Sequence, residues 1–253
     1  MQDSVSRFTS RVADYVSCRP SYPSGVMDLL RRECGLGPGV AVADIGAGTG
    51  IFSRLLLEAG AEVYAVEPNP AMRAAAEEAL GGNSRFHSVA APAERTTLAA
   101  GSVSLVTAAQ AFHWFDATEA RAEFCRILRP GGWAALLWNH RIEGGTPFLA
   151  AYEEFIRTYA PAYNEVARRY PDSQRMTAFF APVRMREERF ANSQTFDYEG
   201  LYGRVLSSSY VPRAGEEGHE PLVAALRRLF AAHQSGGRVR FEYECRVYFG
   251  QLG

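Results

Sequence analysis

The fold of this chain is decided by the sequence V-A-V-A-D-I-G-A-G-T-G, residues 40–50. Small and apolar residues lead into Asp44, glycines follow at the alternate positions Gly46, Gly48 and Gly50, and an apolar-rich run comes next. This order is typical of a buried strand, a tight turn and a helix. Glycine tolerates positive φ and lets another molecule approach the backbone, and the N–H groups that open a helix attract electron-rich groups. We expect a ligand at this turn, with a tight turn that binds nothing as the alternative.

The composition is that of an ordinary globular protein. The chain has 253 residues, of which 47% are hydrophobic, and a formal net charge of −1. This length fits one large α/β domain, or one domain and a smaller cap. No apolar run approaches the roughly 20 residues that cross a bilayer, and the first ten residues contain charges and lack the apolar core of a secretion signal. We therefore expect a soluble cytoplasmic protein that does not bind a membrane.

Charge and cysteine usage exclude several partners and chemistries. The net charge gives no general attraction to nucleic acid, whose nonspecific binding depends on clustered basic residues. The chain contains no lysine, so neither a Schiff-base lysine nor a phosphate-loop lysine is available. The four cysteines and five histidines lack the spacing of a metal site. We expect no bound metal, no nucleic acid partner, and either a monomer or a homodimer.

Strands and helices alternate around the glycine turn. Periodicity and turn residues predict further strands at 61–66, 85–89, 103–109 and 133–139, and helices at 24–32, 52–59, 71–80 and 117–128. The sequence R-P-G-G at 129–132 is a strong turn signal. This alternation indicates βαβ units and a parallel sheet with helices on both faces. Right-handed crossovers place the carboxyl ends of the strands at one edge, where ligands of such sheets bind.

The second half of the chain follows a different pattern. Helices are expected at 148–159, 163–170, 198–206 and 222–233, and strands within 183–196 and at 238–249. The expected fold class is α/β: a doubly wound, mostly parallel Rossmann-like sheet with helices on both faces and a helical cap inserted in the C-terminal half.

Glu67 follows the second strand, at the same expected sheet edge as the glycine turn. An acidic side chain at that position can accept hydrogen bonds from both hydroxyls of an adenosine ribose, and the same geometry serves dinucleotides. Two classes of enzyme are compatible with it, an NAD(P)-dependent oxidoreductase and an S-adenosylmethionine-dependent methyltransferase. An exposed glutamate without a ligand is a third interpretation.

The glycine spacing separates the two enzyme classes. A dinucleotide requires G-x-G-x-x-G to hold its pyrophosphate at the helix N-terminus, whereas this chain has G-x-G-x-G preceded by Asp44. A carboxylate in front of the turn repels a pyrophosphate and attracts the ammonium group of a methionyl moiety. The charge pattern therefore favours S-adenosylmethionine.

Three successive motifs resemble those of the class I S-adenosylmethionine-dependent methyltransferases: D-I-G-A-G-T-G at 44–50, V-E-P-N at 66–69 with Met72, and L-R-P-G-G at 128–132. The resemblance implies that Glu67 binds the ribose hydroxyls and that Pro68 and Met72 flank the adenine. It also implies a turn against the methionine part of the cofactor, with Asp44 nearby, formed by Gly46, Ala47, Gly48, Thr49 and Gly50.

Further segments resemble a small-molecule subgroup of this family that includes trans-aconitate-methyltransferase-like enzymes. A-P-A-E at 91–94 is similar to the loop on the adenine side of the cofactor, which implies contacts from Ala93 and Glu94. A-Q-A-F-H-W-F-D at 109–116 resembles the motif after the fourth strand, and it contains Gln110, a further implied cofactor contact.

The N-terminal segment carries another subgroup motif. Tyr15, Arg19, Pro20, Tyr22 and Pro23 match the pattern Y-x-x-x-R-P-x-Y-P that precedes the core in the subgroup. The resemblance implies that Tyr15 and Arg19 also contact the cofactor.

His113 is the candidate catalytic residue. An imidazole with a pKa of about 6.5 suits a general base for a hydroxyl or a carbon acid, whereas a carboxylate nucleophile needs no base. A contact to substrate or cofactor and a purely structural role are the alternatives. Arg19, Arg141 and Arg184 are candidates to bind a substrate carboxylate through bidentate hydrogen bonds, with an ordinary surface position as the alternative for each.

The sequence thus predicts an S-adenosylmethionine-dependent methyltransferase acting on a small organic acceptor, with carboxylic acids and hydroxyl compounds as candidates. An NAD(P)-dependent oxidoreductase and a non-catalytic S-adenosylmethionine-binding protein are the alternatives. We expect four regions along the chain: an N-terminal helical flap at 1–35, the cofactor-binding Rossmann-like core at 36–140, an acceptor-side cap with one further core strand at 141–237, and a final sheet strand at 238–253.

Overall fold

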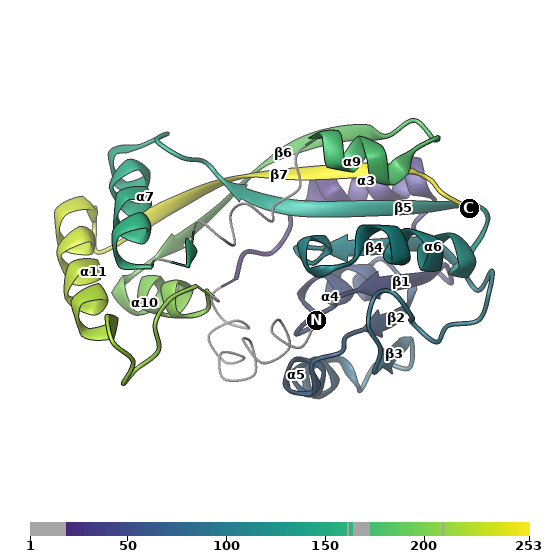
Figure 1. Ribbon diagram of the computed structural model, residues 1–253, viewed down its shortest axis with the longest axis horizontal. Coiled ribbons are helices and arrows are strands. Elements are labelled where there is room, and N and C mark those ends of the chain that lie inside the picture. The colour runs from purple at the N-terminus through teal and green to yellow at the C-terminus, as the bar shows by residue number, and fades with distance from the viewer. Residues whose placement is uncertain (1–18, 161, 164–172, 209) are drawn as a thin grey trace.

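The computed structural model describes residues 19–160, 162–163, 173–208 and 210–253. Its centre is a seven-stranded sheet with the order β3-β2-β1-β4-β5-β7-β6 (Figure 1). The strands β1 to β5 pair in parallel, β7 runs antiparallel to β5, and β6 runs antiparallel to β7. The prediction of a mostly parallel Rossmann-like sheet is confirmed. Residues 1–18 and most of the helix expected at 163–170 lie outside the described residues.

The strands and helices alternate as predicted through the first half. The strands are β1 Ala41–Ile45, β2 Glu62–Val66, β3 Phe86–Val89, β4 Val103–Ala109, β5 Leu128–Arg141, β6 Arg186–Phe196 and β7 Val239–Gln251. The α-helices are α3 Ser24–Cys34, α4 Ile51–Glu58, α5 Pro70–Leu80, α6 Ala117–Ile127, α7 Pro147–Tyr159, α9 Ser173–Phe180, α10 Tyr198–Leu206 and α11 His219–His233. A short 3₁₀ helix, η1, spans Phe112–Trp114.

Two elements differ most from the prediction: α9 was not expected, and β5 was expected only at 133–139. Leu128 already pairs with Val103 of β4, and Trp133 pairs with Leu105, so the expected turn at 129–132 is a bulge within the strand. At its other end β5 continues to Arg141 because β7 pairs with it along this whole stretch. A single strand's pattern does not reveal how far a distant partner extends it.

Helices cover both faces of the sheet. On one face α6 and α9 pack against β1, β4 and β5, with Phe124, Phe179 and Trp138 in one apolar cluster. On the other face α3 and α4 pack through Leu30 and Leu56 in a second cluster. The strand β1 is consequently buried along its whole length, as a central strand of a parallel sheet covered on both faces must be.

The cap stands on the far ends of the three long strands β5, β6 and β7 (Figure 1). There α7, α10 and α11 form a third apolar cluster with β7, which includes Tyr152, Leu201, Leu226 and Phe241. The core strands therefore continue into the cap and position its side chains near the carboxyl edge of the sheet. None of the helices described is both long enough and apolar enough to span a membrane.

Candidate cofactor and acceptor site

The three glycines of the turn after β1 have different surroundings. Gly46, Gly48 and Gly50 all adopt positive φ, at 69°, 57° and 81°. A Cβ on Gly46 would lie 2.5 Å from the Cβ of Ala111, and one on Gly50 would lie 2.6 Å from Cδ1 of Leu80. A Cβ on Gly48 would meet no atom of the described residues within 4 Å. Gly46 and Gly50 thus permit close packing, while Gly48 faces open space that a ligand can fill.

Glu67 connects this turn to the end of β2. Its Oε2 accepts a hydrogen bond of 2.9 Å from the N–H of Gly48, and its Oε1 accepts one of 2.8 Å from the N–H of Asn69. The side chain is mostly buried, which raises the pKa of Glu67, and the two backbone hydrogen bonds oppose this rise. Because each carboxylate oxygen can accept more than one hydrogen bond, acceptors for ribose hydroxyls are available here.

Asp44 lies at the end of β1 and is 1% exposed. Its two carboxylate oxygens accept hydrogen bonds from the hydroxyls of Ser53, at 2.6 Å, and Thr107, at 2.9 Å. Burial raises the pKa of Asp44 to about 6, and the two hydroxyls oppose this rise. A cation bound beside Asp44 would favour its charged form. The environment therefore suits an ammonium group, as the sequence predicts.

The four residues expected near the adenine lie in the segments after β2 and β3. Pro68 is exposed, Met72 is buried in the first turn of α5, and Ala93 is buried. The Oε1 of Glu94 accepts a hydrogen bond of 2.9 Å from the N–H of Asp116, which joins the loop after β3 to the start of α6. Direct contacts of these four residues with adenine stay predictions.

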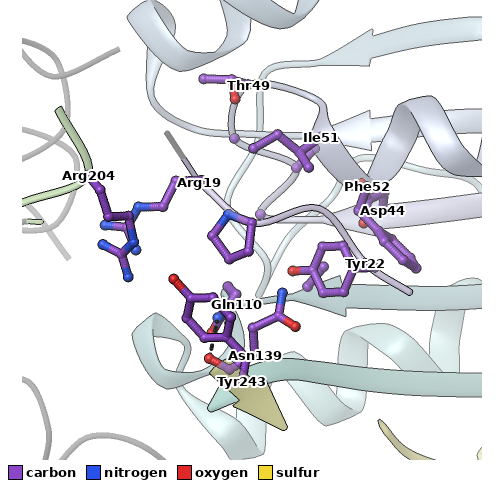
Figure 2. Close-up of a pocket in the computed structure, with 15 residues that line it drawn as sticks. Arg19, Tyr22, Asp44, Thr49, Ile51, Phe52, Gln110, Asn139, Arg204 and Tyr243 are labelled. Atoms are coloured by element: carbon purple, nitrogen blue, oxygen red, sulfur yellow. Dashed lines mark hydrogen bonds between the residues drawn. The ribbon is translucent and has the colours of Figure 1, made fainter. Parts of the chain in front are cut away.

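A cavity opens beside the glycine turn and reaches the cap (Figure 2). The structure brings together there several residues that are distant in sequence. The lining comprises Asp44 of β1, Gly46–Thr49 of the turn, Ile51 and Phe52 of α4, Arg19, Pro20 and Tyr22 of the N-terminal segment, Ala109 of β4 and Gln110 just after it, Asn139 of β5, Arg204 of α10 and Tyr243 of β7. Of the predicted cofactor contacts, Tyr15 lies outside the described residues.

The lining contains buried polar atoms that fit a polar ligand. Neither Oε1 of Gln110 nor Oγ1 of Thr49 has a hydrogen-bond partner within the part of the chain that the structure describes. Gln110 adopts a left-handed φ of 59°, and its Nε2 donates to the carbonyl of Asn139 at 3.2 Å. An unpaired buried polar group costs about 1–3 kcal/mol. Oε1 of Gln110 can accept a hydrogen bond from an ammonium group, and the hydroxyl of Thr49 can donate one to a carboxylate. Together with the open space at Gly48, these groups fit the methionine part of S-adenosylmethionine.

An amide network holds the N-terminal segment against this cavity. The side-chain amides of Asn139 and Asn192 both donate to the carbonyl of Ser21, at 3.3 and 2.8 Å, and Asn192 also donates to Oδ1 of Asn139 at 3.0 Å. Arg19 donates to the carbonyl of Ser207 in the cap at 2.8 Å. Sequence reasoning identified Arg19 but missed the two asparagines, because their partners come from different ends of the chain.

His113 does not line the cavity beside the glycine turn, where a base acting on an acceptor in that cavity would be expected. It lies in η1 and lines a second cavity, between η1, α6 and α9, together with Phe115, Arg121, Arg175 and Phe179. It is not among the described residues that line the cavity beside the glycine turn. The catalytic role of His113 stays a prediction.

Two of the arginines expected to bind a substrate carboxylate, Arg141 and Arg184, do not line the cavity beside the turn. Arg141, at the end of β5, forms an ion pair with Glu153 of α7, and its guanidinium lies 4.8 Å from the centre of the Tyr152 ring. Its charge therefore already has a counterion. Arg184 is exposed and lines neither of the two cavities described above. Arg204, which sequence reasoning did not single out, lines the cavity beside the turn while being only 6% exposed.

Comparisons with known proteins agree with this geometry. Residues 43–136 match the family model of the methyltransferase domain. An uncharacterized methyltransferase of Mycobacterium tuberculosis is 40% identical over 234 residues, which cover 92% of this chain and 88% of that protein. An uncharacterized methyltransferase-like protein of Schizosaccharomyces pombe is 30% identical, over 89% of this chain and 86% of that protein.

Solved structures show the same similarity. A protein of Anaeromyxobacter dehalogenans, solved as a candidate type II methyltransferase, superposes with a TM-score of 0.64 at 26% identity, over 92% of this chain and 98% of that chain. The fold is also shared, at 14% identity and a TM-score of 0.56, with phosphoethanolamine N-methyltransferase 2 of Haemonchus contortus in complex with S-adenosyl-L-methionine. That match covers 98% of this chain and 57% of the other. With the motifs, the fold and these relatives together, the chain belongs to the class I S-adenosylmethionine-dependent methyltransferases.

Proposed function

We propose that this methyltransferase acts on a small organic acceptor that bears a carboxylic acid or a hydroxyl group. The observation that carries the proposal is the single cavity lined both by the turn at Gly48 and by the cap residues Arg204 and Tyr243. The cofactor occupies the side of Asp44, Gly48 and Gln110 in this proposal, and the acceptor lies between the cofactor and the cap. The resemblance to trans-aconitate-methyltransferase-like enzymes supports an organic acid as acceptor.

The chain's own residues contribute mainly by positioning. When bound, S-adenosylmethionine supplies an electrophilic methyl group on a sulfonium sulfur. The cavity walls hold the acceptor atom in line with this group, and such positioning can contribute about 7–11 kcal/mol in favourable cases. Tyr22 and Phe52 are part of the lining, and the centres of their aromatic rings lie 4.9 Å apart. In this proposal the two rings exclude water from the cofactor. A carboxylate acceptor requires no base, whereas a hydroxyl acceptor requires one. His113 stays our candidate for that base, although it lines the neighbouring cavity between η1, α6 and α9.

Membership of this family argues against the NAD(P)-dependent oxidoreductase that the sequence alone left open. The expected monomer or homodimer, the cytoplasmic location and the absence of a nucleic acid partner stay predictions.

A screen with radiolabelled S-adenosylmethionine tests the proposal. The panel contains carboxylic acids, phenols, aliphatic alcohols and amines, and S-adenosylhomocysteine is added as a competitor. We expect transfer to an acid or a hydroxyl compound that S-adenosylhomocysteine suppresses, and at least tenfold less transfer by the Glu67→Ala variant at a cofactor concentration well below saturation. Calorimetric binding of S-adenosylhomocysteine without transfer to any compound would indicate a non-catalytic cofactor-binding protein and contradict the proposal.

A further inference from the structure

Arg204 of α10 is a buried cation, and no carboxylate of the described residues is recorded as its ion-pair partner. Its side chain lines the cavity beside the glycine turn and is 6% exposed. Its Nη1 donates to Oγ of Ser208 at 3.2 Å, and its Nε has no hydrogen-bond partner among the residues that the structure describes. The largest electrostatic influences on Arg204 after its burial come from Tyr243, Tyr152 and Tyr210, and Tyr243 also forms a side-chain hydrogen bond with it. A guanidinium remains protonated in proteins, so this charge is permanent.

Other buried charges of the cap are compensated. Arg141 is paired with Glu153, and Glu153 also accepts a hydrogen bond of 2.9 Å from Arg157. Burying a charge without a counterion costs several kcal/mol. A position that retains such a charge in the wall of a binding cavity is expected to receive its counterion from a ligand.

The cofactor brings a single carboxylate to this cavity. Among the described lining residues, Arg19 and Arg204 are positive and Asp44 is the one acidic residue. The ammonium and the carboxylate of S-adenosylmethionine balance each other, and its sulfonium adds a further positive charge. We expect this carboxylate at Arg19 rather than at Arg204. Arg19 belongs to the N-terminal motif implied to contact the cofactor, whereas Arg204 belongs to the cap.

The position of Arg204 relative to Arg19 supports this division. Arg19 donates to the carbonyl of Ser207, the residue that follows the last turn of α10, three positions after Arg204. Both arginines line the same cavity (Figure 2). Tyr243 of β7 is 2% exposed, lines the cavity beside them, and donates its hydroxyl to Oε1 of Gln194 at 3.1 Å. The cap side of the cavity is thus positively charged and otherwise closed by aromatic and amide groups.

We propose that the methyl acceptor carries a carboxylate that Arg204 binds, and that the methyl group is transferred to a second oxygen of the same molecule. This inference rests on the proposed function. Esterification of the bound carboxylate would remove its charge and leave Arg204 buried without a counterion, which is costly. A second carboxylate or a hydroxyl is therefore the nucleophile. Its oxygen lone pair forms the new O–CH₃ bond, the S–CH₃ bond breaks and its electron pair stays on sulfur, and a hydroxyl also releases its proton to a base.

Binding of carboxylates tests the role of Arg204 before the acceptor is known. The probes are succinate and 3-hydroxybenzoate, each compared with its uncharged amide, succinamide and 3-hydroxybenzamide. They are added to protein saturated with S-adenosylhomocysteine, and affinity is measured by calorimetry. We expect wild type to bind at least one acid at least tenfold more tightly than its amide. Arg204→Met should lose this preference, Arg204→Lys should retain part of it, and Arg228→Met, an exposed arginine on α11, should retain all of it.

Several outcomes distinguish the inference from its alternatives. Wild type that prefers neither acid, or Arg204→Met that keeps the preference, would overturn it. An equally large loss of S-adenosylhomocysteine affinity in Arg204→Met would assign Arg204 to the cofactor and also overturn it. A purely structural Arg204 predicts a lower melting temperature in Arg204→Met, whereas removal of an unpaired buried charge predicts an equal or higher one.

The site of methylation tests the second half of the inference. With an acid of the panel as acceptor, we expect a product that retains one free carboxylate, identified by mass spectrometry and by its titration. A product whose only carboxylate is esterified would overturn the inference and leave the proposed function intact. Carboxylate binding that depends on Arg204 without transfer to any compound would support Arg204 as an anion site while the proposed function fails.

Discussion

The backbone N–H of Gly48 donates a hydrogen bond of 2.9 Å to Oε2 of Glu67. The glycine turn after β1 and the acidic residue after β2 therefore form one unit, although 19 positions separate them in sequence. The turn expected to hold the methionine part and the carboxylate expected to hold the ribose are oriented by each other. Substitutions on either side of this bond should consequently affect binding of the cofactor.

Glu67→Ala should weaken binding of S-adenosylhomocysteine at least tenfold. The variant loses the proposed hydrogen bonds to the ribose, and hydrogen bonds to charged groups contribute about 1.5–3 kcal/mol each. Isothermal titration calorimetry measures the effect. Glu58→Ala, at the exposed end of α4, is the matched control and should bind like wild type. Equal affinities of Glu67→Ala and wild type would show that Glu67 does not bind the ribose.

Alanine at Gly48 and at Gly46 should have different effects. The Cβ of Gly48→Ala would occupy the open space where we place the ligand, so the affinity for S-adenosylhomocysteine should fall at least tenfold. Its folding penalty should be limited to the strain of positive φ, about 1–2 kcal/mol. The Cβ of Gly46→Ala would additionally contact Ala111 at 2.5 Å and should lower the melting temperature more. Thermal unfolding and calorimetry on both variants provide the comparison; the reverse order of the two melting temperatures would contradict it.

Binding of S-adenosylhomocysteine should weaken as the pH falls through about 6, the pKa to which burial raises Asp44. The charged form of Asp44, which attracts the ammonium of the ligand, is lost below that pH, so affinity can fall by up to about tenfold per pH unit. Asp44→Asn should bind more weakly at pH 8 and show a smaller dependence on pH. Calorimetry between pH 5 and 8 on the two proteins measures this, and identical profiles would exclude Asp44 as the titrating group.

The same pKa has the opposite consequence for the ligand-free protein. Because the folded-state pKa of about 6 lies above the unfolded value, of about 3.9, the folded protein binds this proton more tightly. The contribution of Asp44 to stability is therefore fully present below pH 4 and is lost as the pH rises through 6. At pH 8, Asp44→Asn should be at least as stable as wild type in thermal unfolding without ligand.

His113→Ala should lower turnover more than it lowers cofactor affinity if His113 acts on the acceptor. We expect kcat with a hydroxyl acceptor to fall at least tenfold while the dissociation constant of S-adenosylhomocysteine changes less than twofold. General base catalysis contributes about 10²–10⁴-fold in typical enzymes. Because His113 lines the cavity beside α6 and α9 rather than the one at the turn, an unchanged kcat is the outcome that would assign it to that second cavity alone.

Glu153→Leu should destabilise the cap. Glu153 is the counterion of Arg141, which is largely buried beside Tyr152, and breaking a buried pair from one side costs about 3–5 kcal/mol. Denaturant unfolding should therefore show a loss of this size. The double variant Arg141→Met with Glu153→Leu should recover much of it, because no uncompensated charge remains. A double variant less stable than Glu153→Leu would indicate that Arg141 is held mainly by its contacts with the tyrosine rings.

The sequence predicted those elements that a short stretch of residues defines, and it predicted less well those that depend on pairing with distant residues. The alternation of apolar runs and turn residues located β1 to β4 and the helices between them, because each of these elements is defined within a short window. The extent of β5 was underestimated, because residues as late as Tyr243 pair with Arg141 and lengthen it. The same pairing made the core strands continue into the cap, which no local pattern reports.

The candidate site divides in the same way. The sequence by itself determined the glycine turn, the acidic residues Asp44 and Glu67 and hence the class of cofactor, because these groups lie next to one another along successive strands of a parallel sheet. Only the tertiary structure decided that Arg141 is paired, that His113 lines a separate cavity, and that Arg204 lines the same cavity as the turn. Burial and ion pairing depend on which distant segments meet. The sequence around one arginine does not show which of the many arginines is buried or paired.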